Sequence, residues 1–167
     1  MRVDYREQFP KGMAALLSLE EALRDSPLEQ TLLELVRVRA SQINGCAYCL
    51  AMHTRDARAS GEHQVRLDTV AAWRETPFFN DREQAALAWC ESLTDLAAAG
   101  APAEEYARIE AVFSPEEVAA LTFAVVAINN WNRLAVGLGA DVTSLGGIEA
   151  PLTAAASRVS VGGKATA

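Results

Sequence analysis

Residues 31–53 read TLLELVRVRASQINGCAYCLAMH, and this stretch predicts two helices joined by a tight turn. Its first part, up to about Ile43, has apolar residues at helical spacing. Asn44-Gly45 supplies the turn, because both residues tolerate positive φ. The next helix is expected to start near Cys46 and to end before Gly61, so the stretch forms a helix-turn-helix hairpin.

The hairpin carries four side chains typical of redox chemistry. Cys46, Cys49 and His53 are spaced by three and then four residues, which places them on one stripe of a helix. Glu34 lies ten residues before Asn44 and His53 nine after it, so each is roughly 14–15 Å from the turn. In an antiparallel pair of helices Glu34 and His53 are therefore level, and we expect Glu34 to orient His53, which takes the proton from Cys49.

The cysteine pair needs a lowered pKa to react, since an ordinary thiol with a pKa of about 8.5 is only slightly ionised at neutral pH. The helix N-terminus is expected to act most on Cys46, and His53 most on Cys49. Cysteines three apart at a helix start also lie within disulfide distance. A sulfenic acid formed on one would then be resolved by the other.

The remaining sequence predicts an all-α protein. Ser26 is expected to cap a helix that Pro27 opens, and Ser114-Pro115-Glu116-Glu117 to start a long helix that ends near Gly137. Further helices are expected at Met13–Arg24, Glu62–Trp73, Asp81–Ala98 and Ala103–Val112. Residues 1–140 are interpreted as one domain, and residues 141–167 as a tail that is irregular or ordered only against a neighbouring subunit.

Composition limits the functional classes. The chain has 167 residues and a net charge of −7, with Lys and Arg scattered, which argues against a nucleic-acid surface. Its first residues lack the apolar segment of a signal peptide, and its longest apolar stretch, Val118–Ile128, is too short to span a membrane. We expect a cytoplasmic protein, where a close cysteine pair is more often catalytic, redox-active or metal-binding than structural.

Several alternatives stay open. Two thiolates, an imidazole and a carboxylate could bind zinc, whereas covalent haem attachment is excluded because Leu50 occupies the position where that motif needs His. Cys90 is expected in the core and His63 on the surface. Asn129, Asn132 and Arg133 either form a buried network between helices or subunits, or line the active-site pocket.

The residues Glu34, Cys46-Ala47-Tyr48-Cys49, His53, Arg55-Asp56-Ala57-Arg58 and Gly61 resemble the signature of the AhpD-like alkylhydroperoxidases of the carboxymuconolactone decarboxylase superfamily. The stretch Ile128–Leu134 resembles a segment of the peroxidase-related members. The resemblance covers roughly residues 10–140. It implies a multihelical fold and a homo-oligomer, often a trimer or a hexamer.

The resemblance also implies roles. Cys49 would react with peroxide, Cys46 would resolve it and contact the reductant, and Glu34 and His53 would relay protons, with no metal, flavin or haem. Tyr48 departs from the best-known branch, which has His there, so the relay must be shorter or altered. Lactone decarboxylation is disfavoured, because that branch lacks the cysteine pair.

We therefore expect a thiol-dependent peroxidase that uses a hydroperoxide and an external dithiol, dihydrolipoamide-like or thioredoxin-like. A peroxiredoxin is a further candidate partner, and no nucleic acid or membrane is expected. The alternatives are a general thiol-disulfide oxidoreductase and a non-enzymatic redox-sensing or zinc-binding module.

Overall fold

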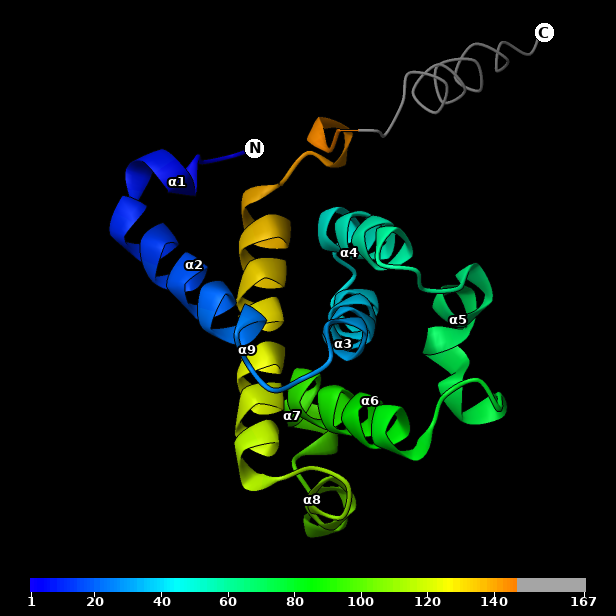
Figure 1. Ribbon diagram of the computed structural model, residues 1–167. Helices are drawn as coiled ribbons and strands as arrows, with labels where there is room; N and C mark the ends of the chain where they lie inside the picture. Colours follow the sequence, from blue (N-terminus) through cyan, green and yellow to red (C-terminus); the bar gives the residue numbers. More distant parts are fainter. Residues whose placement is uncertain (147–167) are drawn as a thin grey trace, which may run out of the picture.

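The computed structural model describes residues 1–146, and every regular element in that range is helical (Figure 1). The elements are α1 Tyr5–Gln8, α2 Pro10–Arg24, α3 Gln30–Ile43, α4 Ala47–Ala59, α5 Gln64–Thr69, the 3-10 helix η1 Val70–Glu75, α6 Asp81–Thr94, α7 Leu96–Ala99, α8 Ala103–Glu110, α9 Pro115–Leu138 and the 3-10 turn η2 Val142–Ser144. The all-α fold class is confirmed, and the prediction that residues 1–140 form one domain stays a prediction.

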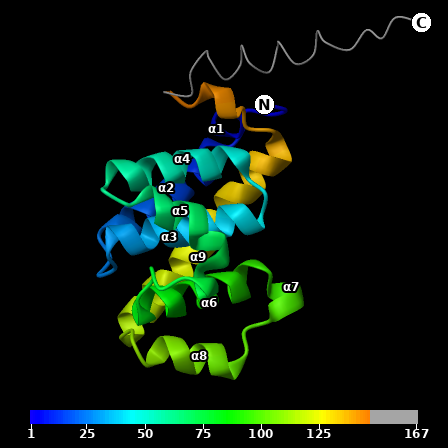
Figure 2. The ribbon, with the colours of Figure 1, turned by 90° about the vertical axis from the view of Figure 1, so that its right-hand side faces the viewer.

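Helix α3 lies in the middle of the fold and packs against α4, α6 and α9 (Figures 1 and 2). Almost every side chain from Leu32 to Ser41 is buried, because neighbouring helices cover it on several sides. Glu34, Arg37 and Ser41 are buried among these apolar residues. Since buried polar groups need partners, α3 is where a polar site can be built into the core.

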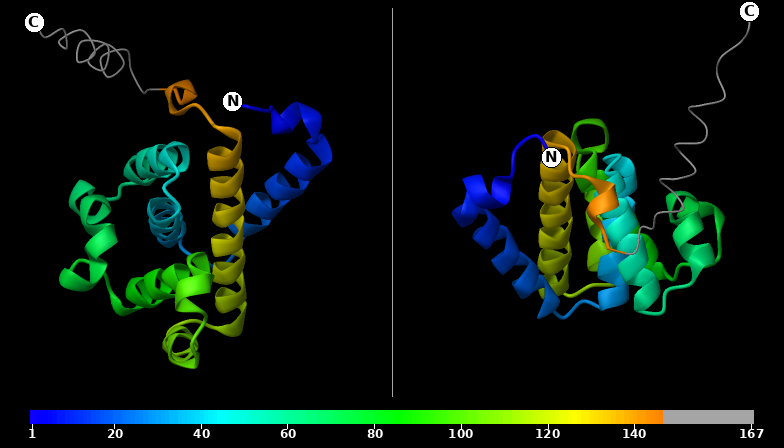
Figure 3. Two further views of the ribbon diagram at one scale, coloured as in Figure 1. Left: turned by 180° about the vertical axis from the view of Figure 1, so that it is seen from behind. Right: turned by 90° about the horizontal axis from the view of Figure 1, so that it is seen from above.

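Helix α9 begins as its sequence predicts. Ser114 and Glu117 form a reciprocal capping box, and Pro115 occupies the first turn. At the other end Gly139 adopts a left-handed conformation, and the backbone N–H of Arg2 donates to the carbonyl of Leu138. Viewed from above, α1 and α2 lie on one side of α9, and α4 and α5 on the other (Figure 3).

The predicted start of α3 is wrong. The helix begins at Gln30, and the Ser26 hydroxyl donates to the carbonyl of Leu23 at 2.6 Å instead of capping the next helix. Leu28 is buried, and Glu29 is extended, with φ −63° and ψ 131°. The chain thus inserts Leu28 into the core before the helix can start.

Two other predicted helices are interrupted. The segment expected as Glu62–Trp73 changes to 3-10 geometry after Thr69, and Ala72 is non-helical. The segment expected as Asp81–Ala98 breaks at Asp95, which separates α6 from α7. The short helix α1 was not predicted from the sequence. The Asp4 side chain accepts from the backbone N–H of Arg6 and caps it.

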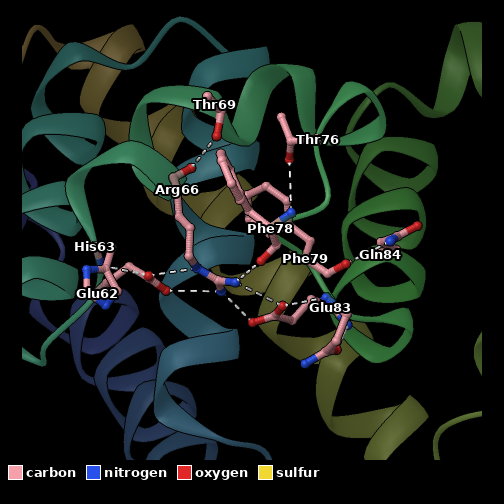
Figure 4. A network of polar contacts seen from close by, with 10 residues as sticks. Glu62, His63, Arg66, Thr69, Thr76, Phe78, Phe79, Glu83 and Gln84 are labelled. Carbon is pink, nitrogen blue, oxygen red and sulfur yellow. Dashed lines mark hydrogen bonds and ion pairs between the residues drawn. The ribbon is translucent and has the colours of Figure 1, made fainter.

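Arg66 fastens the α5 segment to the start of α6 (Figure 4). Its guanidinium donates to Glu62 and Glu83, and its Cζ lies 4.8 Å from the ring centroid of Phe79. Glu83 in turn completes the capping box of α6 with Asn80. This network joins the loop before α5, α5 and the start of α6.

The predicted irregular tail begins with ordered residues. Val142–Ser144 form a 3-10 turn, Leu145 is buried, and Arg55 donates to the carbonyl of Gly146 at 3.1 Å. Residues 147–167 lie outside the described residues. Within residues 1–146, none of the helices is both long and apolar enough to cross a bilayer.

Candidate functional site

The turn between α3 and α4 places Cys46 at the N-terminus of α4. Gly45 adopts φ +63°, a left-handed conformation that costs glycine little. Cys46 is the N-cap of α4, and its Sγ accepts from the backbone N–H of Cys49 at 3.4 Å. The hairpin predicted from residues 31–53 is confirmed.

Glu34 and His53 meet across the hairpin, as predicted from their similar distances to the turn. His53 Nδ1 lies 2.9 Å from Glu34 Oε2, and both side chains are buried. Glu34 Oε1 accepts from Arg37 Nη1 at 2.6 Å and from Gln30 Nε2 at 3.0 Å. Burial raises the pKa of Glu34, but the opposing effects of His53 and Arg37 are together larger and leave it lowered.

Two further helices reach this carboxylate through Arg37. Arg37 Nη2 lies 2.8 Å from Glu20 Oε2 on α2, and Glu20 Oε1 accepts from Trp131 Nε1 on α9 at 2.9 Å. Sequence reasoning missed Glu20, Arg37 and the role of Trp131. The signal was Arg37 itself, a cation inside an apolar run three residues after Glu34.

The pKa values of the two paired cysteines are shifted in opposite directions. Hydrogen bonding from the Cys49 side chain lowers the pKa of Cys46 to about 6 against the opposing effect of burial, with help from backbone N–H groups and the Asn132 side chain. The same bond to Cys46, together with burial, raises the pKa of Cys49. The expected effect of the helix N-terminus on Cys46 is thus present. The expectation that His53 lowers the pKa of Cys49 is wrong for this geometry, because the neighbouring sulfur dominates.

A cavity of about 360 Å³ opens onto Cys49 and not onto Cys46. Its lining includes the aromatic and apolar side chains of Tyr48, Met52 and Trp131 and the polar side chains of Glu34, Arg37 and His53. Of the three residues on the predicted stripe, Cys49 and His53 line this cavity and Cys46 does not.

The other polar candidates form a buried network, as one of the two interpretations expected. Asn44 Nδ2 donates to Asn129 Oδ1 at 3.0 Å and to Asn132 Oδ1 at 2.9 Å, and Arg133 donates to Asn129. Asn132 Nδ2 donates to Ser41 Oγ at 3.1 Å. None of these residues lines the cavity. Asn132 nevertheless acts on the site through its hydrogen bond to Cys46.

Cys90 and His63 lie where the sequence predicts. Cys90 is fully buried, its thiol donates to the carbonyl of Val36, and burial raises its pKa to about 12. His63 is exposed at the start of α5. Among residues 1–146, no group of three or more Cys, His, Asp or Glu side chains could hold a metal ion, so the zinc interpretation finds no ligand set there.

Comparisons with known proteins show one family and several individual proteins that this chain resembles. The model of the carboxymuconolactone decarboxylase family matches residues 10–92. The chain is 37% identical over 138 residues to the uncharacterized protein YdfG of Bacillus subtilis (strain 168). The aligned region covers 83% of this chain and 94% of YdfG.

Solved structures of similar fold include AhpD-like proteins. ATU0492 from Agrobacterium tumefaciens, a protein of unknown function regarded as a candidate antioxidant defence protein AhpD, is 37% identical. Its TM-score is 0.81, over 84% of this chain and 96% of that one. An uncharacterized peroxidase-related protein from Ralstonia eutropha JMP134, an alkylhydroperoxidase AhpD core, has a TM-score of 0.70 at 21% identity, over 81% of this chain and 73% of that one. This last likeness concerns the fold alone.

Proposed function

Because the chain belongs to the carboxymuconolactone decarboxylase family and has the AhpD-like fold, we propose that it is a thiol-dependent peroxidase that reduces organic hydroperoxides. One observation carries the proposal: of the paired cysteines, Cys49 opens into the cavity, and the Glu34–His53 pair lines that cavity too. A nucleophile, a base and a residue that orients the base are the parts such a reaction needs.

The reaction proceeds in three balanced steps. The Cys49 thiol transfers its proton to His53, and the thiolate attacks the terminal oxygen of the hydroperoxide. The O–O bond breaks, Cys49 becomes a sulfenic acid, and the leaving alkoxide takes the proton from His53 to form an alcohol. The Cys46 thiolate then attacks the Cys49 sulfur, the S–O bond breaks, the disulfide closes, and the leaving hydroxide takes a proton from solvent to form water. An external dithiol reduces this disulfide and is itself oxidised to a disulfide.

The opposite pKa shifts of the two cysteines suit the second step. The low pKa of Cys46 provides a thiolate as the resolving nucleophile as soon as Cys49 is oxidised. The high pKa of Cys49 means that its thiolate forms only when His53 or Cys46 accepts the proton. Attack on peroxide therefore needs a proton acceptor, and of the two only His53, paired with Glu34, lines the cavity.

The cavity favours a hydroperoxide with an apolar body. Tyr48, Met52 and Trp131 offer carbon surface next to Cys49, and the Tyr48 hydroxyl can donate a hydrogen bond to a peroxide oxygen. Both cysteines are only 2% exposed, so a folded protein disulfide does not reach them. This burial argues against a general oxidoreductase of protein disulfides and favours a reductant with a slender dithiol arm, such as dihydrolipoamide.

The test is turnover of cumene hydroperoxide with dihydrolipoamide, with hydrogen peroxide as the comparison substrate. Cys49→Ser is expected to abolish turnover, Cys46→Ser to allow one stoichiometric oxidation that a dimedone adduct on Cys49 detects, and Cys90→Ala to retain activity. Full turnover in both Cys49→Ser and Cys46→Ser would refute the proposal. A dimedone adduct on Cys46 in the Cys49→Ser variant, with turnover retained, would reverse the two roles.

We also propose a homo-oligomer, a trimer or a hexamer. Phe123, Val126 and Val136 on α9 are 56%, 46% and 52% exposed, and this apolar surface supports association. Light scattering during size-exclusion chromatography tests it. A monomer at micromolar concentration would contradict the proposal, and Phe123→Glu is expected to reduce the mass.

A further inference from the structure

Arg37 connects the catalytic pair to two other helices. One guanidinium nitrogen, Nη1, binds Glu34 Oε1 at 2.6 Å, and the other, Nη2, binds Glu20 Oε2 at 2.8 Å. The side chains of Arg37 and Glu34 are only 9% and 6% exposed. Trp131 Nε1 holds Glu20 from the far side at 2.9 Å. The cluster thus links α2, α3, α4 and α9 around one carboxylate.

Charge balance gives Arg37 a chemical consequence. Burial by itself raises the pKa of Glu34, but the hydrogen bond and charge of His53, followed by those of Arg37, outweigh it and leave the pKa lowered. Arg37 is always protonated and supplies that charge at 2.6 Å. Arg37 therefore supplies Glu34 with a positive charge that does not depend on His53. A neutral imidazole is the form that accepts a proton.

We propose that Arg37, held by Glu20 and Trp131, is a positioning residue that keeps Glu34 ionised on His53 Nδ1 and leaves His53 Nε2 as the proton acceptor of the cavity. The inference deepens the proposed peroxidase function and rests on it for its role in turnover. An ionised Glu34 accepts the Nδ1–H, and this bond selects the tautomer in which Nε2 carries the lone pair.

Other titratable groups also face His53, and they define what the experiment must separate. The cavity that His53 lines is also bordered by Glu34 and Arg37 of α3, Tyr48, Cys49 and Asp56 of α4, Glu20 and Arg24 of α2, and Tyr5 and Arg6 of α1. Helix α9 contributes Trp131 and Ala135 there, and η2, which also packs on α4, contains no titratable side chain. Asp56 is already paired with Arg55 at 2.9 Å.

The measurement is the ¹⁵N spectrum of the imidazole rings. The chain contains only two histidines, and His63 is exposed, so it serves as an internal reference. In the wild type at pH 8, His53 is expected to show a protonated Nδ1 and an unprotonated Nε2. In Arg37→Gln the buried Glu34 retains His53 as its close cation, so the Nε2 signal is expected to move toward the protonated position.

Three further variants make the test specific, because they are expected to restore, reverse or leave unchanged the shift of the His53 nitrogen signal. Arg37→Lys keeps the charge and is expected to restore much of the wild-type spectrum. Glu20→Gln removes the second carboxylate that binds Arg37, so the guanidinium charge acts on Glu34 alone. This variant is therefore expected to disfavour the protonated form of His53. Arg39→Gln is the matched control, because Arg39 lies on the same helix but binds Glu91 at 2.7 Å and does not line the cavity.

The activity profile gives a second readout. The acidic limb of kcat/KM against pH is expected to move upward by about one unit in Arg37→Gln and downward in Glu20→Gln. Unchanged nitrogen shifts in Arg37→Gln, or the same shifts in Arg39→Gln, would overturn the inference. If Arg37→Gln does not fold, the His53 Nε2 signal is followed from pH 8 to pH 5 in Glu20→Gln, and a protonation midpoint that equals that of the wild type would overturn the inference. The spectra need no peroxide, so failure of the peroxidase proposal would leave them interpretable.

Discussion

The opposite pKa shifts of Cys46 and Cys49 predict a titration that can be measured directly. With a pKa of about 6, Cys46 is about nine-tenths thiolate at pH 7, whereas an ordinary thiol is roughly 3% ionised. The reduced protein is therefore expected to contain close to one thiolate at neutral pH. Its absorbance at 240 nm, followed from pH 4 to pH 9, should show a single step with a midpoint near 6.

Cys49→Ala removes the largest stabilising contribution to that thiolate, the hydrogen bond from the Cys49 side chain. A hydrogen bond to a charged group contributes about 1.5–3 kcal/mol, and one pKa unit corresponds to about 1.4 kcal/mol. The midpoint should therefore rise by about one to two units, to about 7–8. The thiolate fraction at pH 7 would fall to roughly 10–50%.

Cys90 provides the control for this titration. Burial raises its pKa to about 12, so it contributes no thiolate below pH 9, and Cys90→Ala should leave the curve unchanged. A wild-type midpoint near 8.5 would refute the reasoning. So would a Cys49→Ala curve that coincides with the wild type.

Four further outcomes are expected. His53→Gln should lower kcat/KM for cumene hydroperoxide by about 10²–10⁴, the usual contribution of a positioned acid–base group. Leu121→Ala removes a fully buried side chain and should lower the free energy of unfolding in urea by about 2–5 kcal/mol. Ser114→Ala removes the cap of α9 and should lower it by about 0.5–2 kcal/mol. The pKa values of Glu34 and Glu91 are lowered in the folded protein, so these ionised carboxylates stabilise the fold at a pH above their ordinary pKa of about 4.5. This contribution is lost as the pH falls through the folded pKa values, and the urea midpoint should drop there. A urea midpoint independent of pH from 6 to 3 would contradict this.

Two similar local signals show how far sequence reasoning extends to the fold. Ser114-Pro115-Glu116-Glu117 starts α9 with a complete capping box. Ser26-Pro27-Leu28-Glu29 has the same serine, proline and glutamate positions, yet no helix begins there. Leu28 is drawn into the core, and the burial of an apolar side chain outweighs a cap of about 1 kcal/mol. Local sequence signals indicate where a helix can begin, and tertiary packing decides whether it begins there.

The candidate site divides in the same way. The 1.5 Å rise of a helix and the Gly45 turn are local properties, so the sequence by itself determined the hairpin and the meeting of Glu34 with His53. Only the tertiary structure decided that Glu20 and Trp131 hold Arg37 on that carboxylate, because this depends on how α2 and α9 cross α3. The tertiary structure also decided that the cavity opens onto Cys49 and that Cys46 is the cysteine with the lowered pKa. Both depend on burial and on hydrogen-bond partners from distant segments of the chain.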